Sequence, residues 1–265
     1  MKFPFFFIRS KEIVVDCFTH LDYAYDYAKI DHGSKYLPEW WRDTPTVVPN
    51  ISPELVSIKH CTGLIEYYKR GIVLPAWFTM NLNINPIGSD PAWEYETSNA
   101  DVTTDSHMSA QFAGFAGNDG HNIKLVSPWT MKTNTDLSFT WTEPLWSMPT
   151  THKQISVLPA VVNYKYTHAT ELNLFVRQTK ELQTCRIEPF SPLAIMHPMT
   201  ENPIRLVHHL VSIQDWNRSF GIDKLLFRRR DVKDSAQMYR TKKKLVAEVD
   251  RRNQIGRQCP FHRGD

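Results

Sequence analysis

At five places in this chain a proline lies one or two residues before a tryptophan, and that spacing limits the folds the chain can adopt. Proline has no backbone N–H to give to a sheet ladder, and it disfavours helix at the residue before it. Each place therefore predicts a strand edge or a turn that delivers a large ring to the interior. The places are Pro38-Glu39-Trp40-Trp41, Pro75-Ala76-Trp77, Pro91-Ala92-Trp93, Pro128-Trp129 and Pro144-Leu145-Trp146.

Short alternations of apolar and polar residues between turn signals indicate that the middle of the chain is β-rich. Phe78, Met80, Leu82 and Ile84 fall on one face of an extended segment, which predicts a half-buried strand. We expect a mainly β fold, either a β-sandwich or a double-stranded β-helix of the jelly-roll type. The further predicted strands are 93–97, 123–126, 137–142, 154–158, 160–166, 171–176 and 185–187. Residues 11–36, where Tyr23, Tyr25 and Tyr27 alternate, favour a strand but also permit a short helix, and 206–213 fit either.

Two segments have helical rather than strand character. His60–Gly71 predicts a short helix that ends at its glycine. Asp231–Ile255 has few β-branched residues and places its apolar side chains near one stripe, which predicts a basic helix. We therefore expect a β-rich core domain over residues 1–227 and a basic helical extension over residues 228–265.

Charge is divided unevenly between these two parts. Residues 228–265 hold 12 Lys and Arg against 5 Asp and Glu, or +7, so the rest of the chain carries −4 of the total of +3. Arg228-Arg229-Arg230 and Lys242-Lys243-Lys244 have no stacking aromatics between them, which favours electrostatic contact over base readout. We expect the tail to dock on a protein partner. Nucleic acid bound without sequence specificity and self-association into a homo-oligomer are alternatives.

The chain lacks the signals of export and of membrane insertion. Charged residues interrupt the apolar start Met1–Ile8 too early for a signal peptide, and no run reaches the roughly 20 apolar residues of a membrane span. The four cysteines form no close pair, which suits free thiols in a reducing compartment.

Histidines are the candidate metal ligands. An oxygenase-like site in a double-stranded β-helix needs two histidines and one carboxylate around an open metal position. The best set is His107 with Asp101 or Asp105 and, from a later strand, His197. Its pattern is weak because Met108 and Ser109 follow His107, so the carboxylate two residues on is missing. The sequence identifies no cofactor.

Three ordered motifs resemble a group of uncharacterised proteins that is common in marine bacteriophages. They are Ser127-Pro128-Trp129-Thr130-Met131-Lys132-Thr133, Leu158-Pro159-Ala160-Val161-Val162-Asn163, and Glu188-Pro189-Phe190 with Ile195–Pro198. The resemblance covers about residues 55–200. An acidic residue often follows the Val-Val pair in that group and a Pro-Gly turn the Lys-Thr pair; this chain has Asn163 and Asn134-Thr135-Asp136 instead. The resemblance implies a phage-encoded β-sandwich or double-stranded β-helix, located in the host cytoplasm or the virion.

The leading hypothesis is a non-catalytic phage protein whose β-sandwich core carries a basic tail that docks on a partner, within the virion. One alternative is a metal-dependent enzyme, with iron or a similar metal held by His107, Asp105 and His197. Another is a carbohydrate-binding module that stacks exposed tryptophans on sugar rings.

Overall fold

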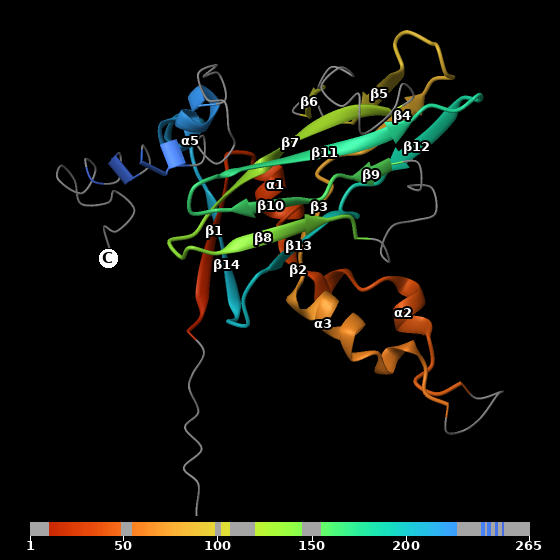
Figure 1. Ribbon diagram of the computed structural model, residues 1–265, viewed down its shortest axis with the longest axis horizontal. Coiled ribbons are helices and arrows are strands. Elements are labelled where there is room, and N and C mark those ends of the chain that lie inside the picture. Colours follow the sequence, from red (N-terminus) through yellow and green to blue (C-terminus); the bar gives the residue numbers. More distant parts are fainter. Residues whose placement is uncertain are drawn as a thin grey trace, which may run out of the picture.

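Most of the described chain is extended, and its strands form three sheets (Figure 1). The computed structural model describes residues 11–48, 55–98, 102–106, 120–144 and 155–226, together with 240, 241, 243, 244, 247, 248 and 251. The expectation of a mainly β protein is confirmed.

The first sheet has the strand order β14-β1-β7-β11-β9, with β6 paired to β7 beside that path. β1 and β14 run parallel, with Ile13 opposite Ile204 and Thr19 opposite Leu210, whereas the other pairs are antiparallel. The strands are β1 (Ile13–Thr19), β6 (Thr103–Asp105), β7 (Gly120–Lys132), β9 (Ile155–Val157), β11 (Ala169–Arg177) and β14 (Ile204–Leu210).

Two smaller sheets complete the strand layout. The second has the order β10-β8-β13-β3-β2 and the third the order β12-β4-β5, and all of their pairs are antiparallel. Their strands are β2 (Asp31–His32), β3 (Ile72–Pro75), β4 (Met80–Ile84), β5 (Trp93–Thr97), β8 (Ser138–Thr142), β10 (Ala160–Asn163), β12 (Gln183–Ile187) and β13 (Pro192–Pro198).

One apolar core draws side chains from all three sheets. In β1 and β4 every second residue is buried, as a half-buried strand requires. The core includes Val15 and Leu125 from the first sheet, Phe139 from the second and Leu82 from the third. The three sheets therefore stabilise one another through a shared interior.

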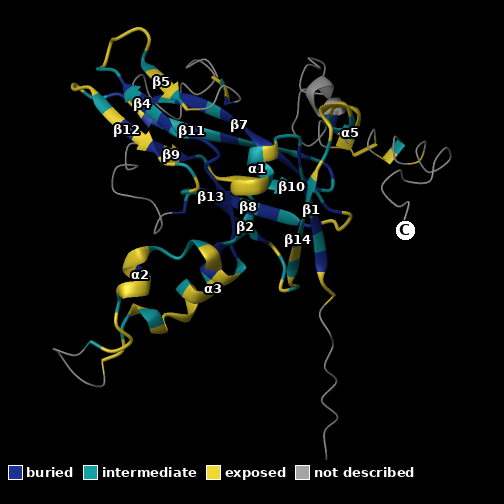
Figure 2. Cartoon of the chain, turned by 180° about the vertical axis from the view of Figure 1, so that it is seen from behind, coloured by how far each residue is buried: buried dark blue, intermediate teal, exposed yellow. Residues whose placement is uncertain are grey.

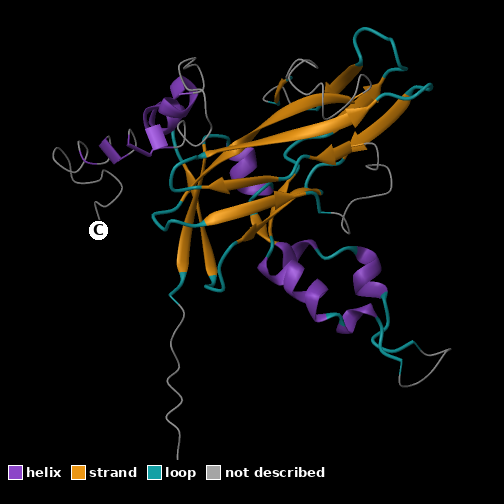
Figure 3. Ribbon diagram, viewed as in Figure 1, coloured by secondary structure: helices purple, strands orange, loops and turns teal. Residues whose placement is uncertain are grey.

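The described helices other than α1 (Asp22–Tyr27) lie at the margins of the sheets, whereas α1 lies among the strands (Figure 3). α1 resolves the ambiguity at the three tyrosines in favour of a helix. α2 (Glu39–Asp43), the 3-10 turn η2 (Ile58–His60) and α3 (Thr62–Arg70) follow a further 3-10 turn, η1 (Gly33–Tyr36). α5 (Ile213–Leu226) follows the last strand, and its Trp216 indole donates to Thr130 Oγ1 of β7 at 3.1 Å.

The predicted strands are confirmed as strands, with shifted ends. Trp93–Thr97 matches β5, and residues 123–126 form only the middle of β7. Of the ambiguous residues 206–213, those up to Leu210 belong to β14, which begins at Ile204, while Ile213 begins α5. The helix predicted at His60–Gly71 is α3.

Of the tryptophans at the five proline sites, Trp41, Trp77 and Trp129 are buried, Trp93 is partly buried, and the prediction of an interior ring was wrong for Trp40, which is 39% exposed. Pro38 has the extended backbone expected of it, but it is the N-cap of α2, so Trp40 and Trp41 lie on a short helix and not at a strand edge. Proline is tolerated at the start of a helix because the first N–H groups have no partner within the helix.

The C-terminal extension lies largely outside the described residues. Its described members, residues 240, 241, 243, 244, 247, 248 and 251, are helical, but they do not define a continuous helix. Residues 227–239 are also outside the description, so the boundary between residues 227 and 228 stays a prediction.

Candidate interaction surface

Residues 37–70 form a helical lobe that projects from the sheets, and much of its apolar surface is exposed (Figure 2). We call this element the lobe; it contains α2, η2 and α3, and its residues 49–54 are outside the description. Among its described residues only Trp41 and Tyr68 are buried. Six large apolar side chains are at least a third exposed, namely Trp40, Val47, Leu55, Val56, Ile58 and Ile65.

Val47 and Val56 lie opposite each other in an isolated antiparallel bridge. The backbone bonds that flank them run from Val48 N–H to the Leu55 carbonyl at 2.9 Å and from Ser57 N–H to the Thr46 carbonyl at 3.0 Å. Val47 and Val56 are therefore a non-hydrogen-bonded pair, whose side chains lie close together on one face. That face gives the lobe an adjoining pair of exposed aliphatic side chains.

The lobe is attached to the body at the C-terminal end of α3. His197 of β13 bonds the Tyr67 carbonyl through Nε2 at 2.9 Å, and the two rings lie 4.7 Å apart. Arg70 pairs with Glu201 at 3.0 Å and donates to the Thr200 carbonyl. A pocket of about 390 Å³ lies at this junction, lined by Gly63, Glu66, Tyr67, Arg70, His197 and Pro198.

Two titratable side chains of this pocket, His197 and Tyr67, contact each other where the lobe joins the body. Desolvation lowers the pKa of His197 below its usual 6.5, against the opposing effect of its bond to the Tyr67 carbonyl. Because a carbonyl only accepts, His197 Nε2 carries the proton of the neutral ring. Burial raises the pKa of Tyr67 to about 12, so this phenol is protonated at neutral pH.

Two glycines allow the lobe to approach the body closely. Gly33 N–H donates to the Gly71 carbonyl at 2.7 Å. A Cβ on Gly33 would lie 2.7 Å from the Tyr68 carbonyl oxygen, and one on Gly71 would lie 2.4 Å from Ile195 Cδ1. Both contacts are shorter than van der Waals packing allows, so any larger residue must displace the junction.

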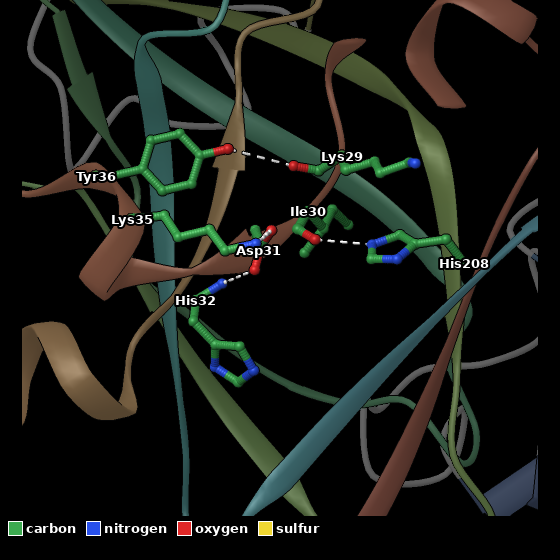
Figure 4. A network of polar contacts seen from close by, with 7 residues as sticks. All are labelled: Lys29, Ile30, Asp31, His32, Lys35, Tyr36 and His208. Carbon is green, nitrogen blue, oxygen red and sulfur yellow. Dashed lines mark hydrogen bonds and ion pairs between the residues drawn. The ribbon is translucent and has the colours of Figure 1, made fainter. Parts of the chain in front are cut away.

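A short segment, Ala28–Tyr36, ties the lobe to two sheets (Figure 4), and we call it the strap. The indole of Trp129 donates to the Ala28 carbonyl at 2.8 Å, and His208 Nε2 bonds the Ile30 carbonyl at 2.8 Å. Trp129 lies on β7 and His208 on β14, both in the first sheet. Strap residues Asp31 and His32 then pair with β3 of the second sheet.

Polar contacts within the strap hold its turn, as Figure 4 shows. Asp31 accepts a bond from the His32 N–H at 2.7 Å and pairs with the ammonium of Lys35. The Tyr36 hydroxyl donates to the Lys29 carbonyl at 3.3 Å. Desolvation lowers the pKa of His208, which favours the neutral ring that bonds the strap. The strap therefore fixes where the lobe leaves the body.

A described part of the basic tail contacts the body at a different place. Lys243 Nζ lies 4.0 Å from Asp136 Oδ2 and 4.9 Å from the centre of the Tyr166 ring. Asp136 also accepts bonds from the Tyr166 hydroxyl at 2.9 Å and from Asn163 Nδ2 at 2.8 Å. These two bonds, with Lys243 as a smaller contributor, lower the pKa of Asp136. We call Asp136, Asn163 and Tyr166 the tail cradle.

The predicted metal ligands are only partly described. Asp105 is exposed at the end of β6 in the first sheet, and its Oδ1 accepts the Ser106 N–H at 2.8 Å. His197 belongs to the second sheet and bonds α3, while His107 and Asp101 lie outside the described residues. Within the ranges that the structure describes, no three potential ligands form a metal-binding group. The metal site stays a prediction.

The lobe surface was missed by the sequence reasoning. Residues 37–53 are proline-rich, with neither strand alternation nor a long helical stripe, and the sequence predicts only a connector at their end, Pro49–Pro53. One signal in the sequence indicated this surface. A solvated connector rarely carries many large apolar residues, yet the residues around the two prolines include Val47, Val48, Leu55, Val56 and Ile58.

Comparisons with known proteins assign no family. No family model matches the chain, and no curated protein matches it significantly. None of the described helices combines the length and apolar character that a membrane crossing requires.

Proposed function

We propose that this chain is a non-catalytic interaction protein, in which a β-sandwich core presents the lobe and the basic tail to protein partners. The observation that carries the proposal is the exposure of six large apolar side chains on an element that buries only Trp41 and Tyr68 among its described residues. Exposed apolar side chains are costly in water, and where several gather on one element, as Val47 and Val56 do in their bridge, they commonly serve an interface.

The sandwich part of the proposal is supported by the shared core. Two larger sheets and one smaller sheet all direct alternate residues into one apolar interior, which is the arrangement expected of packed antiparallel sheets. A jelly-roll order of strands is the finer form of this proposal. The outer faces of the sandwich carry polar residues such as Lys124 and Glu171, which form an ion pair between β7 and β11.

Placement in a phage is supported by the motifs that resemble the marine bacteriophage group. Two of those motifs lie on strands of the core, since Ser127–Lys132 belongs to β7 and Ala160–Asn163 to β10. They supply core contacts, such as the bond from Trp129 to the strap. The resemblance thus bears on the fold, and we propose the virion or the host cytoplasm as the location.

The test is a capture experiment with the full chain as bait, in lysate of cells infected by a phage that carries this gene. Val56→Asp combined with Ile58→Asp places two charges on the lobe, and Leu182→Asp is the matched control. Leu182 is also exposed, at 59%, but lies between β11 and β12. We expect the wild-type and control baits to retain the same protein and the lobe variant to lose it.

A chain that ends at Phe227 tests the tail in the same assay. Loss of the partner in this variant alone assigns docking to the tail rather than the lobe. If all four baits retain the same set of proteins, or none retains any, neither element docks and the proposed function is wrong. Circular dichroism of each bait excludes misfolding as the cause of a loss.

A further inference from the structure

The charges of the lobe limit what can cover its apolar surface. Residues 37–70 contain four basic side chains, Arg42, Lys59, Lys69 and Arg70, and four acidic ones, Glu39, Asp43, Glu54 and Glu66. The lobe is therefore electrically neutral, in contrast to the tail at +7. A polyanion gains little from a neutral surface, because phosphate binding depends on an excess of Lys and Arg.

The described parts of the same chain do not cover the lobe. Figures 1 and 2 place α5 on the opposite side of the sheets from α2 and α3. Lys243, from the tail that follows α5, lies against Asp136 and Tyr166, at the turn after β7 and the end of β10. The described contact of the tail is thus with the tail cradle and not with the lobe.

A neutral apolar surface has the properties required for pairing with itself. In a two-fold dimer each copy presents the same patch, so a patch with net charge would meet its own charge and be repelled. With equal numbers of acidic and basic residues over positions 37–70, the lobe avoids that repulsion. Opposite charges on the two copies can then pair at the rim, around an apolar centre.

We propose that the occupant of the lobe surface is the lobe of a second copy of this chain, related by a two-fold axis. This inference rests on the proposed function, since it names the protein that the lobe binds. Val47 and Val56, which share one face of the bridge, form the apolar centre of the interface, with the exposed Trp40 and Ile58 of the same lobe. The tail remains available for a different partner, because its described contact lies on another side of the body.

The test is the molar mass of the purified full chain by light scattering, measured from about 1 to 200 μM. We expect a dimer that dissociates on dilution, a monomer for Val56→Asp with Ile58→Asp throughout the range, and a dimer for Leu182→Asp. Circular dichroism and an unchanged hydrodynamic radius for the monomer show that the lobe variant is folded. A second variant, Val47→Lys, repeats the test on the same face with the opposite charge.

Two outcomes overturn the proposal. One is a wild-type chain that is monomeric at every concentration. The other is a dimer that both lobe variants leave intact, which places the interface elsewhere. A monomer that binds an apolar dye only after residues 1–10 are deleted identifies the chain's own N-terminal segment as the occupant instead. The capture experiment is independent of these results, because a monomer can still retain a different protein through the lobe.

Discussion

At the scale of single residues, the junction between the lobe and the body depends on the absence of a side chain at Gly33. A Cβ there would lie 2.7 Å from the Tyr68 carbonyl oxygen, which is backbone and cannot rotate away. We expect Gly33→Ala to lower the free energy of unfolding by about 1–3 kcal/mol, the usual cost of overpacking. Urea unfolding at equilibrium measures this change.

Gly63 provides the control for that substitution. It lies in α3, and a Cβ there would meet nothing within 4 Å. Gly63→Ala should therefore raise the free energy of unfolding by about 0.5–1 kcal/mol, because alanine loses less backbone entropy in a helix. Equal effects of the two substitutions would show that the close approach at Gly33 does not matter.

Residue type alone predicted much of the interior but not the polar contacts that fix it. The burial of Trp77, Trp129 and Trp141 follows from their apolar bulk beside extended segments. The partner of Trp129 does not, since the Ala28 carbonyl is about a hundred residues away in the sequence. His197 was singled out for metal chemistry, whereas its described contact is with the backbone of α3. In sequence, a histidine that binds a metal looks the same as one that bonds the backbone of a neighbouring helix.

At the scale of elements, alternation found strands with one solvent-facing side, such as β4, but it left β1, which also alternates, in an ambiguous segment and missed strands buried on both sides. β4 and β5 were predicted, while β3 was not, because all four of its residues are buried and give no period of two. β13 was missed for the same reason, with a run of buried residues in its middle. α2 is too short for helical periodicity to be visible.

The tail cradle leads to a prediction about the C-terminal element. Lys243 contacts Asp136 and Tyr166, whereas its neighbour Lys244 is exposed and makes no ion pair among the described residues. We expect Lys243→Gln and Asp136→Asn each to increase hydrogen exchange in the tail and in the turn at Asp136. Lys244→Gln removes the same charge without that contact and should leave exchange unchanged.

Salt provides an independent check of the same contact. Because Lys243 and Asp136 are exposed, their attraction should be screened as ionic strength rises above about 0.1 M. Wild-type exchange in the tail should then approach that of Lys243→Gln, which should itself respond little to salt. Identical exchange for all three variants at low salt would contradict a docked tail.

At the scale of the whole molecule, self-association through the lobe would link folding to concentration. A chain that unfolds from a dimer to two monomers gains stability by mass action as its concentration rises. The lobe buries only Trp41 and Tyr68 among its described residues, so the second copy would supply apolar contacts that the monomer lacks. We therefore expect the thermal midpoint of the wild type to rise with concentration.

For a chain of this length we expect a rise of roughly 1–3 °C for each tenfold increase in concentration, measured by scanning calorimetry above the dissociation constant of the dimer. Val56→Asp with Ile58→Asp should give a midpoint that is independent of concentration, and Leu182→Asp should behave as the wild type does. A concentration-independent midpoint for a wild-type chain that is dimeric by mass would mean that the dimer dissociates before the chain unfolds. The lobe would then add no stability to the fold, and its apolar surface would act in binding alone.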